Sequence, residues 1–330
     1  MAGLAAVLAG VWAYRKQRLS ERDDARAEAD QTRADADQAR ADEAQFTQRY
    51  STAAEQLGHD KAAVRLAGVF AMARLADDWS KQRQQCIDVL CAYLRMLAEH
   101  SSGSETEVRA TIVRTIAAHL RDDSAISWVR HDFDFTGAAL HDAEFDGVTF
   151  CGKTSFFGAK FSGGHTSFGR TTFSGYTSFD QAEFSDGQTS FGKATFSGKY
   201  ISFDGAEFSG GHTLFSQTEF SGAYAGFDGV KFSGGYMGFD GVKFSGERIS
   251  FEEAEFSGER ISFEEAEFSG ERISFGDATF SGGHTSFSGV TFSGGTTADE
   301  ATARSSFVGT TILWGPISPH PPVPVAAGTQ

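Results

Sequence analysis

Cysteine and proline are scarce in this chain of 330 residues, and basic side chains are outnumbered by acidic ones. The three cysteines are too few and too irregularly spaced for a disulfide framework or a zinc motif, which indicates reduced thiols in a cytoplasmic protein. The formal net charge of -15 argues against direct or non-specific nucleic-acid binding. The sequence has no Walker loop, dinucleotide fingerprint or nucleophile elbow, so we expect no enzyme, no cofactor and no metal site.

The apolar run at the start of the chain is too short to cross a membrane alone, since a span needs about 20 residues. It covers residues 2–14, and Arg15, Lys16 and Arg18 follow it at once. Because basic residues stay on the cytoplasmic side, we expect residues 1–14 to be the C-terminal part of an inner-membrane anchor whose true start lies upstream. The bulk of the chain would then lie in the cytoplasm, and a frayed soluble helix is the alternative.

Residues 20–45 consist almost wholly of Ala, Arg, Asp, Glu and Gln, which predicts that 15–45 is a charged helical stalk. Ion pairs at i,i+4 are expected between Arg26 and Asp30 and between Arg33 and Asp37. An alanine seam would bury little area, so a solvated single helix that acts as a spacer is favoured over a weak coiled coil. An oligomer is only weakly supported.

A small helical domain is expected at 46–122. Its amphipathic helices are predicted near 44–57, 61–77, 82–98 and 105–120. Asp60 is positioned to cap the second of them. The arrangement looks like helix pairs of an α-solenoid, which cannot bury both faces alone, so one face should dock on the next domain and cover its open strand edge.

From Phe156 onward the chain repeats a 12-residue unit, Ser-Phe-x-x-Ala-x-Phe-Ser-Gly-x-x-Thr, with substitutions. The phenylalanine spacing alternates between five and seven residues, with one slip to six between Phe173 and Phe179, and a purer spacing of five precedes it. A helix face needs spacings of three and four, and a long strand needs strict alternation, so neither explains the pattern. Short strands that turn at each corner and send one large side chain inward do explain it.

The inward positions predict a core made largely of phenylalanine. The residue two before each ring is small or mid-sized, as at Ala159 and Val230, and can share the interior. Ser-Gly after each second phenylalanine suits a tight corner. The positions singled out as structural core are Phe135, Leu140, Phe145, Phe150, Phe203, Phe208, Phe251 and Phe256.

The stretch 135–148, with Phe135, Leu140 and Phe145 spaced by five and alanine two residues before Leu140 and Phe145, resembles the pentapeptide-repeat family. The later repeats resemble its Phe-rich subgroup. This resemblance covers about 133–312 and implies that the N-terminal helices are followed by a right-handed quadrilateral β-helix. The seven-residue spacing departs from the family pattern and implies about 24 residues per coil where the family has about 20 residues.

A flat solenoid with one 12-residue unit per coil is the competing geometry, but two phenylalanine rings per coil are too bulky for a flat core. The front of the chain is also similar to actinobacterial family members that carry an anchor, a stalk and a segment like the one at 54–66.

The exposed positions repeat polar groups, and repetition argues against a catalytic site, which is normally unique. Glu252-Glu253 recurs as Glu264-Glu265. Glu-Arg dipeptides that predict surface ion pairs occur at 247–248, 259–260 and 271–272. Equivalent corners carry His165, His212 and His284, and similar corners carry Tyr200, Tyr224 and Tyr236, which could offer a contact surface.

The leading interpretation is a non-enzymatic, membrane-anchored cytoplasmic scaffold that binds an unidentified protein through the flank of the β-helix. The resemblance supplies an alternative, an acidic rod that mimics DNA and binds a topoisomerase. Residues 150–296 hold 18 acidic and 10 basic side chains, and this interleaved charge, together with the anchor, weighs against mimicry. A purely structural rod is a further alternative, and the proline-rich residues 313–330 are expected to be a disordered tail.

We predict that Phe203→Ala or Phe251→Ala lowers the free energy of unfolding by about 3–5 kcal/mol, because each change removes an inward ring and leaves a cavity. Chemical denaturation of the purified chain measures the loss. A double variant that stays soluble and melts like the parent would contradict a phenylalanine core.

Overall fold

The computed structural model describes residues 2–96, 103–185, 187–292, 306–307 and 311–313. The chain divides into two compact units, Met1–Glu55 and Gln56–Gln330. Helix α1 (Ala2–Leu57) makes up the first unit and ends in the second. Because α1 is one continuous helix of 56 residues, the predicted stalk and the predicted helix near 44–57 form a single element.

The exposed ion pairs of α1 join residues three apart in the sequence, whereas pairs four apart were predicted. Arg33 pairs with Asp30 at 3.5 Å, and Arg40 pairs with Asp37, so the spacing is i,i+3. Such exposed pairs contribute little to stability in either register. The predicted anchor segment forms the beginning of α1, and no helix within the described residues combines the length and apolar content needed to cross a membrane.

Three shorter helices follow in the second unit: α2 (Ala62–Asp78), α3 (Arg83–Arg95) and α4 (Gly103–Leu120). Helix α3 ends three residues before its predicted end. The prediction that Asp60 caps α2 is wrong, because Lys61 holds the N-cap position without a side-chain hydrogen bond. The Arg65 guanidinium instead donates to the carbonyls of His59 and Asp60, at 2.9 and 2.7 Å, and ties this corner to its own helix.

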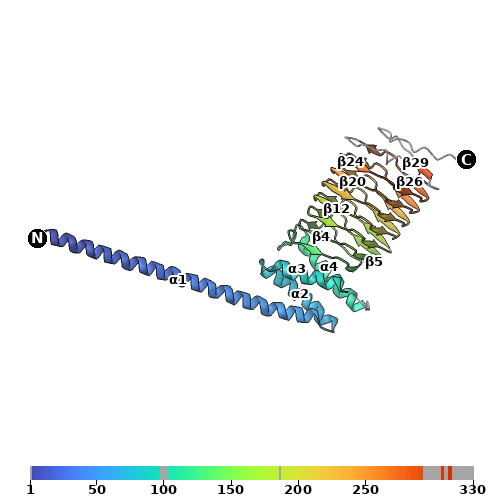
Figure 1. Cartoon of the computed structure of the whole chain (residues 1–330). Coiled ribbons are helices and arrows are strands. Elements are labelled where there is room, and N and C mark those ends of the chain that lie inside the picture. The colour runs from blue at the N-terminus through green and yellow to red at the C-terminus, as the bar shows by residue number, and fades with distance from the viewer. Residues whose placement is uncertain (1, 97–102, 186, 293–305, 308–310, 314–330) are drawn as a thin grey trace. The chain divides into compact units, whose positions relative to one another are not determined.

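The rest of the described chain is a parallel β-solenoid of about seven turns built on four sheets (Figure 1). Sheet A contains β1 (Phe133–Asp134), β4 (Thr154–Ser155), β8 (Thr177–Ser178), β12 (Tyr200–Ser202), β16 (Tyr224–Gly226), β20 (Arg248–Ser250) and β24 (Arg272–Ser274). Sheet B contains β2 (Ala139–His141), β5 (Lys160–Ser162), β9 (Glu183–Phe184), β13 (Glu207–Phe208), β17 (Lys231–Phe232), β21 (Glu255–Phe256), β25 (Thr279–Phe280) and β28 (Ser306–Phe307).

The other two sheets are built in the same way. Sheet C contains β6 (His165–Ser167), β10 (Gln188–Ser190), β14 (His212–Leu214), β18 (Tyr236–Gly238), β22 (Arg260–Ser262), β26 (His284–Ser286) and β29 (Thr311–Leu313). Sheet D contains β3 (Thr149–Phe150), β7 (Thr172–Phe173), β11 (Thr195–Phe196), β15 (Glu219–Phe220), β19 (Lys243–Phe244), β23 (Glu267–Phe268) and β27 (Thr291–Phe292). Leu313 thus ends a strand, whereas the rest of the predicted tail lies outside the described residues.

The strand register confirms the predicted length of a coil. Tyr224 pairs with Tyr200 on one side and Arg248 on the other, so the sequence separation between stacked positions of sheet A is 24. The first coil is shorter: Phe133 pairs with Thr154, which agrees with the purer spacing of five residues in that region. The flat alternative with one 12-residue unit per coil is therefore wrong.

Four columns of stacked phenylalanine rings, one at each side of the coil, fill the interior. Within a column, neighbouring ring centroids lie between 4.5 and 5.4 Å apart, and the ring planes are within 25° of parallel. Rings of different columns also meet edge to face, at angles up to 89°. Each buried ring stabilises the fold by about 1.5–3 kcal/mol, and each aromatic pair adds roughly 0.5–1.5 kcal/mol.

Two kinds of corner close the coil, and glycine has a different role in each. At the tight corner Phe-x-x-Ala, the Ala206 N–H donates to the Phe203 carbonyl at 2.9 Å, and Gly205 takes a positive φ of 66°. At Ser-Gly, a Cβ on Gly222 would lie 1.9 Å from the carbonyl oxygen of Gly198 in the previous coil. The chain bends at this Ser-Gly, and its glycine also permits the close approach of successive coils.

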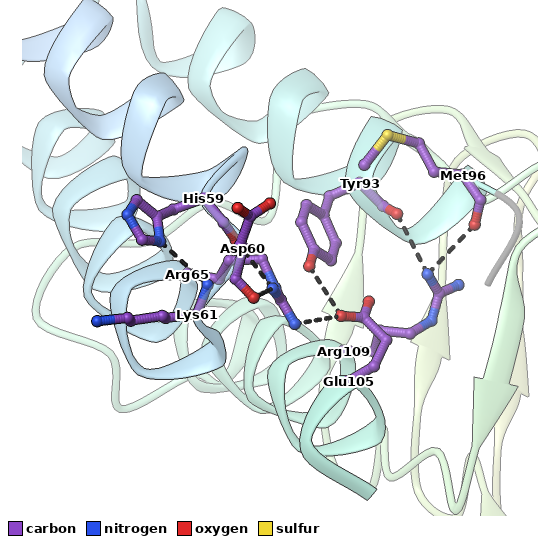
Figure 2. Close-up of polar contacts among 8 residues, drawn as sticks. All are labelled: His59, Asp60, Lys61, Arg65, Tyr93, Met96, Glu105 and Arg109. Carbon is purple, nitrogen blue, oxygen red and sulfur yellow. Dashed lines mark hydrogen bonds and ion pairs between the residues drawn. The ribbon is translucent and has the colours of Figure 1, made fainter. Parts of the chain in front are cut away.

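Helices α3 and α4 cover the first coil, as predicted (Figure 1). Arg95 of α3 donates to the backbone carbonyl and the carboxylate of Asp134, both at 2.8 Å. The buried guanidinium of Arg109 donates to the carbonyl of Ala139 at 3.0 Å. It also donates to the carbonyls of Tyr93 and Met96, both at 3.3 Å (Figure 2). This one side chain ties the end of α3 to strand β2.

Candidate functional site

The eight residues predicted as structural core lie inside the solenoid. Each of Phe135, Leu140, Phe145, Phe150, Phe203, Phe208, Phe251 and Phe256 is at most 2% exposed. Leu140 stands at the start of a column, paired with Phe161 of the next coil. These side chains hold the coils together and leave recognition to the exposed positions.

A column of tyrosines crosses the outer side of sheet A. Tyr176 stacks on Tyr200 with ring centroids 4.8 Å apart, and Tyr200 stacks on Tyr224 at 5.2 Å. A cation closes each end of the stack, because the Lys153 ammonium lies 5.6 Å from the Tyr176 centroid and the Arg248 guanidinium lies 5.7 Å from that of Tyr224. The stack is thus a continuous aromatic strip with cation–π contacts at both ends.

A column of carboxylates runs beside the tyrosines, at the turn that follows sheet A. Asp180, Asp204, Asp228 and Glu252 occupy the same position in four successive coils. Each aspartate uses its Oδ1 atom to accept a backbone N–H from the next coil: Asp204 to Asp180 at 3.2 Å, Asp228 to Asp204 at 3.0 Å and Glu252 to Asp228 at 2.9 Å. The ladder leaves the Oδ2 atoms unused. We call the three tyrosines and these four acids the tyrosine–carboxylate face.

The electrostatics of this face reflect its crowding. Burial, together with the nearby charges of Asp228 and Asp180, raises the pKa of Asp204 above its ordinary value. Burial and the neighbouring carboxylates also raise the pKa of Tyr200 and Tyr224, so the tyrosine hydroxyls remain donors at neutral pH. The face thus places a row of like charges beside uncharged hydroxyls.

A small residue allows Tyr224 to lie against this column. A Cβ on Gly226 would stand 2.5 Å from Asp204 Oδ1 and 2.7 Å from the Tyr224 hydroxyl, so both groups approach the same point. The signal in the sequence is Tyr-x-Gly-Phe-Asp, which replaces the usual serine by glycine at 224–228 and again at 236–240. The second copy lies on sheet C, so the motif does not by itself identify the tyrosine–carboxylate face.

Tyr236 lies apart from the other two predicted tyrosines. It begins β18 of sheet C, pairs with His212 and Arg260, and donates its hydroxyl to Asp240 at 2.9 Å. Residues one repeat unit apart in the sequence lie on different sheets, whereas residues two units apart stack on each other in successive coils. Tyr176, which the sequence interpretation did not include, is 43% exposed and extends the sheet A column by one coil.

The predicted Glu-Arg ion pairs are wrong. No pair between the glutamate and the arginine of these dipeptides occurs in the described part of the chain; Arg248 stacks on Tyr224 and Arg260 on Tyr236 instead, each at 5.7 Å. Tyrosine rings one coil below give these guanidinium groups a better contact than an adjacent carboxylate.

The three predicted corner histidines do not meet. His165, His212 and His284 all begin strands of sheet C, but Gln188 separates the first two, and Tyr236 and Arg260 separate the second from the third. Over the described ranges, no cluster of three potential metal ligands is found.

A hollow of about 320 Å³ lies where α4 meets the first coils, lined in part by Glu105, Arg109, Leu140 and His141. Its charged groups already have partners within the protein. Arg109 donates to backbone carbonyls, and Glu105 accepts from Arg65 at 3.0 Å and from the Tyr93 hydroxyl at 3.2 Å (Figure 2). The Arg109 contact joins α4 to the solenoid, and the Glu105 contacts join α4 to α2 and α3.

Comparison with known proteins adds no relative: no family model, no characterised protein and no solved structure matches the chain.

We predict that Asp204→Asn raises the melting temperature at pH 7. A raised pKa in the folded state means that Asp204 contributes stability below its ordinary pKa and loses it as pH rises, so an uncharged amide removes a penalty at neutral pH. The amide oxygen can still accept the Asp228 N–H. The gap between variant and parent should close as pH falls toward 3.8, measured by thermal unfolding.

Asp240→Asn is the matched control, because Asp240 has the same place on sheet C but accepts the Tyr236 hydroxyl. We expect this variant to lose about 1 kcal/mol. An Asp204→Asn variant that melts below the parent at pH 7 would contradict the crowding of charge on the tyrosine–carboxylate face.

Proposed function

We propose that this protein is a non-enzymatic scaffold that binds another protein through the tyrosine–carboxylate face. The observation that carries the proposal is the stack of Tyr176, Tyr200 and Tyr224 beside the column of four acids. Tyrosine supplies large, rigid contact area at low entropic cost and is enriched in protein interfaces. The acids add charge selectivity and faster encounter with a basic partner.

The rigidity of the solenoid supports this use. The buried residues Ile201, Phe203 and Ala206 are neighbours along the chain of the half-buried Tyr200 and Asp204, so the core fixes both of these positions. A partner then binds a preformed surface and loses less of its binding energy to ordering.

The proposal extends to the protein family. We place the chain among pentapeptide-repeat proteins and infer that its coil is right-handed and quadrilateral in section. Four parallel sheets and one inward side chain at each side of the coil support this assignment, as does the spacing of five from Phe135 to Phe150. The 24-residue coil makes it a variant with two extra residues at alternate corners.

We further propose that residues 1–14 belong to a membrane anchor and that the solenoid works on the cytoplasmic side of the inner membrane. The apolar segment followed at once by Arg15, Lys16 and Arg18 supports this orientation.

Photo-crosslinking in cells tests the binding face. A photoreactive residue replaces Tyr176 in the full chain, and a matched one replaces Glu219, which is exposed on sheet D. We expect a defined protein adduct from position 176 only. The double change Asp204→Asn and Asp228→Asn should reduce its yield about fivefold, which corresponds to roughly 1 kcal/mol of lost binding.

The double change Asp240→Asn and Glu264→Gln on sheet C is the control and should leave the yield unchanged. Equal adducts from positions 176 and 219, insensitive to the sheet A acids, would contradict the proposed face. If those adducts contained a topoisomerase, the DNA-mimic interpretation would replace it.

A further inference from the structure

Helix α1 carries a cationic pattern that matches the tyrosine–carboxylate face in charge and in spacing. Arg15, Arg18, Arg22 and Arg26 follow one another at three or four residues, which places them on one side of the helix. All four are exposed, and Asp24 and Glu28 fall on the far side at 3.6 residues per turn. We call these four residues the arginine stripe.

The arginine stripe is available for a partner. Arg18 donates to the Tyr14 hydroxyl at 3.0 Å, but Arg15, Arg22 and Arg26 pair with no acidic side chain in the part of the chain that the structure describes. Further along α1, by contrast, Arg33 and Arg40 are already paired with Asp30 and Asp37.

The spacing of the stripe fits the spacing of the coils. A helix rises about 1.5 Å per residue, so steps of three and four residues are about 4.5 and 6 Å. The tyrosine rings of successive coils are 4.8 and 5.2 Å apart, and the acids belong to the same coils. A helix lying along the column can therefore offer one guanidinium to each carboxylate over three or four coils.

The chemistry of the face is also suited to arginine. Arg248 already stacks on Tyr224 at the end of the column, and the Oδ2 atoms of Asp180, Asp204 and Asp228 are not used by the ladder. Guanidinium groups can bind carboxylate oxygens and pack on aromatic rings at once. Added cations would also relieve the mutual repulsion of the acids.

We propose that two copies of this chain associate reciprocally, the arginine stripe of each lying along the tyrosine–carboxylate face of the other. The inference rests on the proposed function, because it names a partner for the same face. Reciprocal exchange gives a closed dimer with two equivalent interfaces.

Sedimentation velocity of the full chain in mild detergent at low salt tests the dimer. The parent should dimerise and should dissociate as salt is raised. The face variant, Asp204→Asn with Asp228→Asn, and the stripe variant, Arg18→Gln with Arg22→Gln, should each weaken dimerisation at least tenfold. The sheet C control, Asp240→Asn with Glu264→Gln, should dimerise like the parent.

Mixing the face variant with the stripe variant gives the sharpest readout. The mixture keeps one intact interface, between the stripe of the first and the face of the second, so it should associate although neither variant does so alone. A face variant that dimerises like the parent would overturn the proposal and would favour a coiled coil through α1.

The outcomes also separate this inference from the proposed function. A parent that stays monomeric at low salt, while position 176 still gives a charge-dependent adduct with a different protein, overturns the dimer and leaves the scaffold standing. A monomeric parent without such an adduct overturns both.

Discussion

The stacking of phenylalanine rings along the axis is the interaction on which the rest of the structure depends. A short strand of two or three residues has little stability of its own, and each coil is held because its rings lie about 5 Å from those of its neighbours. The same contact fixes how many residues one coil takes. A ring that missed its column by one residue would turn outward and expose a large apolar side chain.

This constraint carries through to the surface. Once the rings set the register, each surface position recurs above its equivalent in the previous coil, so Tyr176, Tyr200 and Tyr224, which follow one another at intervals of 24 residues, stack on one another. The acids line up for the same reason, and the close backbone approach at Ser-Gly brings them within range of one another's charge. The proposed binding face is thus a consequence of the core.

The sequence predicts the core well because each phenylalanine of the repeat marks one inward position of a coil. The placement of Tyr236 was wrong because the sequence repeats every 12 residues, whereas residues stack on one another only every second repeat. Tyr236 lies one repeat after Tyr224 and therefore belongs to sheet C. Tyr176 stands 24 residues before Tyr200, one full coil, so the two-unit period would have identified it as a member of the column. The predicted cap at Asp60 was wrong for another reason. The Arg65 guanidinium, five residues further along, donates to the Asp60 carbonyl from within α2. A side chain that reaches back in this way produces no periodic pattern in the sequence.

Deleting residues 247–270 from the full chain tests the central claim, that stacked rings set a 24-residue coil. After the deletion, Glu271-Arg272-Ile273-Ser274 takes the place of the identical Glu247-Arg248-Ile249-Ser250, and Arg272 can stack on Tyr224. The matched control removes only 247–266 and leaves Phe244 and Phe268 four residues apart. Our account predicts that the first variant unfolds cooperatively near the parent's melting temperature while the second loses that transition; equal unfolding of both variants would contradict it.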